Sequence, residues 1–272
     1  MDICQAPYRE LHHSILNYKG TNLYFEVLYP WLENAVSIKA WLHDFATRNG
    51  SPIPEASYED LFQLYALSRV NELLLLRFQY GQADGSSWLE PKITIEQYTE
   101  FMESLGFESV TSSEFSPFYH EILEVIQDKN QKTKISIFKR FWPGFMLGNM
   151  MFSRSGTCVT GGALNINKSI AEASTLYWAY RRKNRPYQDL SHGWGSNSQW
   201  RTRFRRDYRI GNLLYYNVDG ENNLHLAQCN SDKDDSIELQ ERLELLKHRC
   251  FVTVNKPHDD LFPYRDSYCE AA

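Results

Sequence analysis

The first part of the chain has the hydrophobic spacing of helices. Ser57 precedes an amphipathic run that ends before Gly81, and Thr94 stands three residues before Gln97, which is the spacing of a capping box. Serine followed by proline at 116–117 predicts another helix start. The predicted helices cover residues 7–18, 21–47 with a break at Pro30, 57–80, 94–106 and 116–128. Their leucines and aromatic side chains would form the core of a helical bundle.

The second part changes to short runs that are typical of strands. Residues 134–141 alternate lysine, serine and isoleucine, and two β-type runs at 213–218 and 224–228 flank a hairpin signal at 219–223. Apolar residues at helical spacing predict one helix over 237–249. The remaining expectations are a closing strand over 251–254 and an ordered coil over 257–272.

Together these patterns predict an α+β fold. An acidic N-terminal helical bundle over 1–130 is followed by a basic α+β half over 131–272 that contains a small antiparallel sheet. A chain of 272 residues is long enough for one large domain or two small ones. The two regions either form separate domains or share one core, and the pattern leaves both arrangements open.

Charge divides the chain at nearly the same place. Residues 1–128 hold 19 acidic and 7 basic side chains, whereas residues 129–230 hold 16 basic and 5 acidic ones. Residues 231–272 are acidic again, with 10 acidic against 6 basic side chains. The net charge of the whole chain is only −5, so the chain is not a polycation. This division favours either internal ion pairing or recognition of a charged partner.

The cysteines and the apolar runs indicate the compartment. Five cysteines are widely scattered and no pair has the C-x-x-C spacing, which is typical of reduced thiols in the cytosol. The first residues show no secretory signal, and the apolar stretch at 141–152 is too short to span a bilayer. We therefore expect a cytoplasmic protein that does not enter a membrane.

The densest candidate site is a loop of small residues and tryptophan followed by arginines. Its candidate binding residues are Trp194, Trp200, Arg201, Arg203, Arg205 and Arg206. In an extended strand Arg201, Arg203 and Arg205 would share one face at a spacing of roughly 6–7 Å, which is close to the repeat of a phosphodiester backbone. These arginines would hold phosphate, or they would pair with carboxylates of the acidic half. The tryptophans would contact a partner by stacking.

Candidate catalytic chemistry is sparse. His192 and Asp207 could flank a reactive centre, but no nearby serine lies in a G-x-S-x-G motif. The glycine-rich stretch at 156–163 lacks the Lys-Ser/Thr of a phosphate-binding loop, and it predicts a tight turn or a close backbone approach instead. No set of histidine, cysteine or acidic residues has the spacing of a metal-binding motif. The sequence therefore predicts neither a metal nor a cofactor.

Two functional hypotheses remain. The first is a non-catalytic intracellular binding protein, specifically an immunity-type inhibitor that neutralises a bacterial toxin by direct binding. An acidic docking face and aromatic anchors would serve such a role with a basic protein partner. The alternative is a nucleic-acid- or nucleotide-processing enzyme that holds phosphate on the arginine-rich strand, with His192 and Asp207 near the chemistry.

Overall fold

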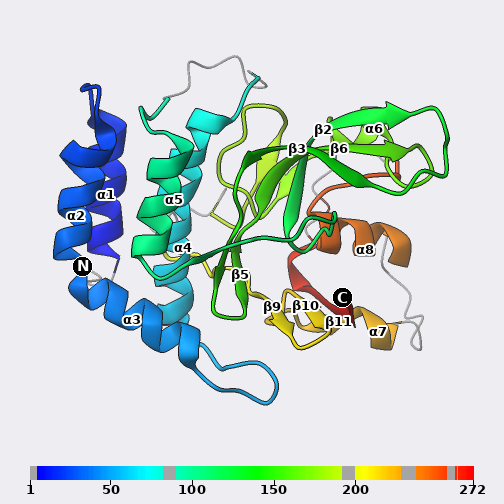
Figure 1. The fold of residues 1–272 in the computed structure, drawn as a ribbon. Helices are drawn as coiled ribbons and strands as arrows, with labels where there is room; N and C mark the ends of the chain where they lie inside the picture. The colour runs from blue at the N-terminus through cyan, green and yellow to red at the C-terminus, as the bar shows by residue number, and fades with distance from the viewer. Residues whose placement is uncertain (1–4, 82–89, 192–199, 228–236, 256–260, 262) are drawn as a thin grey trace.

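The computed structural model describes residues 5–81, 90–191, 200–227, 237–255, 261 and 263–272. Helices dominate the N-terminal part and strands dominate the rest, which confirms the predicted α+β fold. The N-terminal helices are α1 (Ala6–Asn17), the π-helical turn η1 (Tyr24–Leu28), α2 (Tyr29–Asn34), α3 (Val36–Thr47), α4 (Tyr58–Leu75) with the 3-10 turn η2 (Leu76–Phe78), and α5 (Ile95–Ser104). Figure 1 shows these helices on one side of the molecule and the strands on the other.

Two helices begin at the capping boxes that the sequence predicts. At the start of α4 the Ser57 hydroxyl accepts a hydrogen bond from the Asp60 amide at 3.1 Å, and the Asp60 carboxylate accepts one from the Ser57 amide at 2.9 Å. Thr94 and Gln97 make the same reciprocal pair at the start of α5. The helical run changes from the π-helical turn η1 to α2 at Tyr29, next to Pro30, and proline is tolerated in this first turn. The chain leaves the helical conformation at Ala35, between α2 and α3.

One predicted helix is wrong. Residues 116–117 open a turn, and the chain from His120 to Asp128 forms the strand β2. Ile122 and Val125 are buried in this strand, which pairs in parallel with β6 (Ser155–Gly162). Long-range pairing therefore overrides the local helix-start signal at the serine and proline.

The strands form two main sheets. The larger sheet has the order β1 (Glu108–Ser109), β4 (Phe145–Leu147), β5 (Met150–Ser153), β9 (Asp207–Ile210), β10 (Leu213–Tyr216), β12 (Asp266–Ala271) and β11 (Asn222–Asn223). Its neighbouring strands are antiparallel except for β11 and β12. The smaller sheet has β6 between β2 and β3 (Ser136–Trp142), and β7 (Leu176–Tyr177) pairs with β8 (Tyr187–Gln188).

The short helices of the second part are α6 (Lys168–Ala171), α7 (Leu224–Ala227), α8 (Leu239–His248) and the 3-10 turn η3 (Pro263–Arg265). In this part the predictions of β3, β10 and α8 are confirmed, although each element differs by a few residues at its ends. The predicted hairpin at 219–223 is wrong: β10 pairs with β9 across a turn at Gly211, and a short helix begins at Leu224. Residues 251–254 form no strand, and the predicted coil at the C-terminus contains β12.

The glycine-rich stretch lies in the central strand of the smaller sheet. A Cβ atom on Gly162 would lie 2.3 Å from the backbone of Gln131, and one on Gly156 would lie 2.4 Å from the Trp142 ring. The predicted close backbone approach is therefore confirmed at Gly162, because only glycine leaves room for the neighbouring chain.

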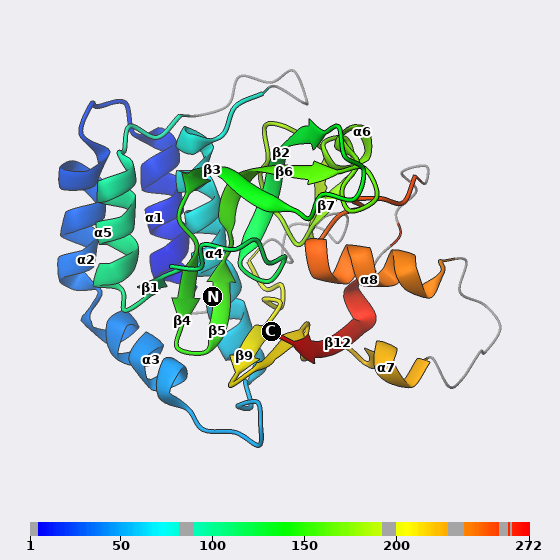
Figure 2. The ribbon, with the colours of Figure 1, turned by 45° about the vertical axis from the view of Figure 1, so that its right-hand side comes forward.

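The main hydrophobic cluster contains side chains from both parts of the chain. Leu67 and Leu74 of α4 belong to the same buried cluster as Phe145 of β4, Met150 of β5 and Tyr208 of β9. Figure 2 shows β4 and β5 lying next to the helical side. This packing places the inner surface of α4 against the strand ends, where the candidate site lies.

Candidate functional site

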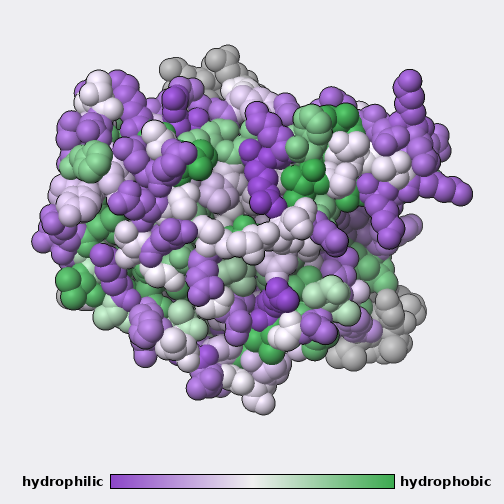
Figure 3. Space-filling model, in the orientation of Figure 1, coloured by the Kyte–Doolittle hydropathy of each residue, from purple (hydrophilic) through white to green (hydrophobic). Residues whose placement is uncertain are grey.

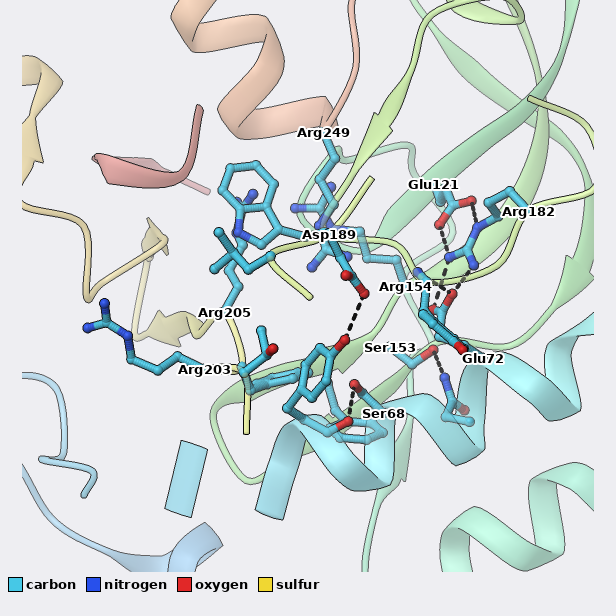
Figure 4. Close-up of a pocket in the computed structure, with 18 residues that line it drawn as sticks. Ser68, Glu72, Glu121, Ser153, Arg154, Arg182, Asp189, Arg203, Arg205 and Arg249 are labelled. Carbon is cyan, nitrogen blue, oxygen red and sulfur yellow. Dashed lines mark hydrogen bonds and ion pairs between the residues drawn. The ribbon is translucent and has the colours of Figure 1, made fainter. Parts of the chain in front are cut away.

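A cavity lies between α4 and the segments around the strand ends (Figure 4). Its charged lining residues are Glu72, Glu121, Arg154, Arg182, Asp189, Arg203, Arg205 and Arg249. Aromatic side chains from α4, from the segment after β7 and from the segment before β9 complete much of the wall. Arginine therefore dominates the charge on the cavity wall, although carboxylates accompany it.

Three of these arginines surround one carboxylate. Asp207 is fully buried at the start of β9, and its Oδ1 accepts a hydrogen bond from Arg205 Nε at 2.7 Å. Its Oδ2 accepts one from Arg154 Nη2 at 3.2 Å and lies 3.7 Å from Arg249 Nη2. The amide of Asn217 donates a further hydrogen bond to Oδ1 at 2.8 Å. We call Arg154, Arg205, Arg249 and Asp207 the arginine cluster.

Burial and mutual repulsion affect the titration of this cluster. Burial alone would raise the pKa of Asp207, but the guanidinium groups of Arg205 and Arg154 outweigh that effect and hold the pKa below its usual value. Burial lowers the pKa of Arg205 to about 10 and that of Arg249 to about 10. Positive charge is therefore in excess at this end of the cavity.

A second buried ion pair closes the other end of the cavity. Arg182 donates hydrogen bonds to both carboxylate oxygens of Glu121, at 2.7 and 2.9 Å, and its Nη2 donates to Glu72 at 3.0 Å. Glu72 lies on α4 and Glu121 lies on β2, so the guanidinium of Arg182 joins the helical side to the smaller sheet. Both oxygens of Glu121 are already engaged, which makes this pair a structural element.

The predicted arginine strand does not form. The strand β9 begins only at Asp207, and the preceding residues are irregular. Arg201 and Arg203 are exposed, whereas Arg205 is buried against Asp207. Arg206 donates from Nε and Nη2 to the carboxylate of Asp219 and from Nη1 to the carbonyl of residue 54. The arginines therefore do not share one face.

The remaining predicted residues divide between described and undescribed parts of the chain. Trp200 is half-buried, with its ring 5.2 Å from that of His12 and the guanidinium of Arg69 lying 4.3 Å from its ring centre. His192 and Trp194 lie outside the described residues.

Sequence reasoning missed several important members of the cavity. Arg154 stands in a run of apolar and small residues between β5 and β6, and a lone arginine in such a run is a signal for a buried ion pair. Arg249 ends α8 with a left-handed backbone, at φ +63°, a conformation that costs energy for a side chain of this size. Only the folded chain brings these two residues to Asp207.

A second candidate feature lies on the outside of the helices. Phe25 and Tyr29 are 59% and 45% exposed, and Glu26 and Glu33 beside them on η1 and α2 are exposed as well. The hydroxyl of Tyr24 hydrogen-bonds to Glu100 of α5, and burial raises the pKa of Tyr24 to about 12. The rings of Phe25 and Tyr29 lie 5.1 and 6.4 Å from the Tyr24 ring. The two exposed aromatic residues and three glutamates therefore form one surface.

We call Phe25, Glu26, Tyr29, Glu33 and Glu100 the acidic aromatic face. The sequence contains no lysine or arginine between Lys19 and Lys39, or between Lys92 and Lys129. Glu96 and Glu103 continue the row of exposed carboxylates along α5. Figure 3 shows hydrophobic patches among hydrophilic residues on the helical side of this view.

No protein-family model, no curated protein sequence and no solved structure matches this chain. Among the described residues, no three His, Cys, Asp or Glu side chains gather closely enough to hold a metal ion. Within the same part of the chain, no helix has both the length and the apolar character that crossing a bilayer requires.

Proposed function

We propose that this chain is a non-catalytic intracellular binding protein, and that it acts as an immunity-type inhibitor which neutralises a bacterial toxin by direct binding. The acidic aromatic face carries the proposal. Exposed aromatic side chains among carboxylates fit a basic protein partner, because rings supply contact area and the negative charge speeds association.

The burial of Asp207 favours this function over the enzymatic alternative. A general base needs a free carboxylate oxygen within reach of a substrate, whereas the oxygens of Asp207 are held by Arg205, Arg154 and the amide of Asn217. The alternative also needs Arg201, Arg203 and Arg205 on one face, and these residues point to different surroundings. Both observations support a binding role.

Reversing charge on the acidic aromatic face tests the proposal. We expect Glu26→Lys with Glu33→Lys to weaken binding of a basic toxin partner more than about tenfold, because like charges placed opposite each other in an interface are strongly unfavourable. The measurement is affinity capture from nuclease-treated lysate, followed by titration of the captured protein and by rescue of cells that express it.

The control is Glu114→Lys with Glu221→Lys, which changes the net charge equally at exposed positions outside this face. The control should bind the partner like the parent protein and should protect cells equally well. Retention of the partner by the Glu26 and Glu33 variant would contradict the proposal. Capture of nucleic acid alone, lost on nuclease treatment, would favour the enzymatic alternative.

A further inference from the structure

The arginine cluster has more positive charge than its carboxylate neutralises. Three guanidinium groups share the single carboxylate of Asp207, so positive charge is in local excess at this end of the cavity. The other carboxylates on the cavity wall already have partners: Glu72 and Glu121 share the guanidinium of Arg182, and Asp189 accepts hydrogen bonds from Tyr65 and Ser191. Their negative charge offsets part of the local excess, but their oxygens are not hydrogen-bonded to the arginine cluster. Buried charge without a partner is costly.

Each guanidinium also keeps one buried nitrogen without a hydrogen-bond partner among the described residues. These nitrogens are Nε of Arg154, Nη1 of Arg205 and Nε of Arg249. The other nitrogens of Arg154 and Arg205 are fixed by Asp207 and by carbonyl oxygens of α8, at 2.9 Å to residue 247 and 2.7 Å to residue 246. The indole ring of Trp178 supports Arg205, whose guanidinium lies 4.1 Å from the ring centre. The guanidinium groups of Arg154 and Arg205 are thus held in place, and all three arginines have a donor nitrogen to spare.

The size of the cavity restricts the ligand. Its free volume for water-sized groups is about 40 Å³, which suits about three water molecules or one small oxyanion. Figure 4 shows Arg249 entering the cavity from the end of α8, whereas Arg203 extends away from it.

We propose that the arginine cluster is a binding site for one phosphate group, taken either as inorganic phosphate or as a small phosphomonoester. The oxygens of a phosphate group accept charge-assisted hydrogen bonds from guanidinium nitrogens, and the three unpartnered nitrogens of the cluster are such donors. This site is separate from the acidic aromatic face, so it does not depend on the function proposed above.

Titration of the full chain with inorganic phosphate tests the site. Calorimetry at pH 7.5 and constant ionic strength should show saturable binding at one site, and the Tm should rise by about 5 °C at a hundredfold excess over Kd. Potassium chloride at matched ionic strength should give neither effect. A parallel titration with glycerol 3-phosphate shows which ligand the site prefers. Tighter binding of glycerol 3-phosphate indicates a phosphomonoester, and tighter binding of inorganic phosphate indicates the free ion. The absence of saturable binding in both titrations would overturn the proposal.

Substitution of Arg249 locates the site. Arg249→Asn suits the left-handed backbone at this position, and it leaves Asp207 paired with Arg205 and Arg154. We expect phosphate affinity to fall about tenfold or more, whereas Arg77→Gln on the exposed turn η2 should leave it unchanged. Arg249→Lys, which keeps the charge, serves as a second variant and should bind with intermediate affinity. Unchanged phosphate affinity in a folded Arg249 variant would show that phosphate does not bind at the arginine cluster. A phosphate affinity that depends on Arg203 instead would show the same.

Discussion

The carboxylate of Asp207 receives hydrogen bonds from two arginines and one backbone amide while a third guanidinium lies 3.7 Å away. Its position at the start of β9 is completely enclosed. At the scale of single residues, loss of this carboxylate would leave three guanidinium groups without the acidic group that they share. Substitution of Asp207 therefore tests whether this residue has a structural role or a catalytic one.

Asp207→Asn should lower the free energy of unfolding by about 3–5 kcal/mol, because removal of one partner leaves buried charges unpaired. Urea denaturation monitored by circular dichroism measures this change. The matched control is Asp44→Asn, whose ion pair with Arg48 is largely exposed and should contribute less than about 1 kcal/mol. Equal stability of the Asp207 variant and the parent protein would contradict a structural role.

At the scale of elements, helix α4 connects the core to the cavity. It begins at the Ser57–Asp60 capping box, and it carries Glu72 to the cavity three turns later. Asp60 also accepts hydrogen bonds from Arg48 Nη1 at 2.8 Å and from Trp41 Nε1 at 3.1 Å, so this cap ties α3 to α4.

Ser57→Ala should destabilise the protein by about 1 kcal/mol, because the amide of Asp60 loses its side-chain acceptor. Thermal and urea unfolding measure the change. Ser14→Ala is the matched control: Ser14 is exposed in the last turns of α1, where alanine is the better helix former and the substitution should be neutral or slightly stabilising. A cap variant that is as stable as the control would show that the hydroxyl contributes nothing.

The same elements show what could be predicted from sequence. Helices with signals at their ends, such as α4 and α5, were found because capping is local. The strand β2 was missed because its partner β6 lies some thirty residues away in the chain, and propensity does not encode such pairing. For the same reason the sequence indicates Asp207 only as a candidate catalytic residue, and its contacts with Arg154 and Arg249, which are distant in the chain, could not be predicted.

At the scale of the whole molecule, the two charge regions are partly paired with each other. Arg182 contacts Glu72 and Glu121, and Lys183 contacts Glu90 at 3.1 Å, so basic residues after 128 meet acidic residues before it. Arg205 and Arg206 instead pair with carboxylates of their own region. The pairing across regions leaves the carboxylates of the acidic aromatic face outward, where they are exposed.

Buried histidines make the stability of the whole molecule depend on pH. His12 and His120 are 3% and 1% exposed, and burial lowers the pKa of His12 to about 3 and that of His120 to about 4, from an ordinary value of 6.5. Burial likewise lowers the pKa of His248 to about 3. The unfolded chain therefore binds more protons than the folded chain between about pH 6.5 and pH 4. Stability from these groups is fully present above pH 6.5 and falls as the pH drops through this window. Asp207 and Glu121, whose pKa values are lowered, add a loss only below about pH 4.

Urea denaturation at pH 7, 6 and 5 should show a fall in the free energy of unfolding, with each of the three histidines contributing about 1 kcal/mol per pH unit between pH 6 and 5. His12→Gln should reduce the dependence of the free energy of unfolding on pH by the contribution of one histidine, about 1 kcal/mol per pH unit. This reduction does not depend on how the substitution changes stability at pH 7. Ser14→Ala, at an exposed position of α1 that carries no titratable group, should leave the pH dependence unchanged. A free energy that stays constant from pH 7 to pH 5 would mean that these histidines gain protons in the folded chain as readily as in the unfolded one. The surroundings of His12 would then have to admit a charge, which the burial of this histidine and the positive charge of Arg69 oppose.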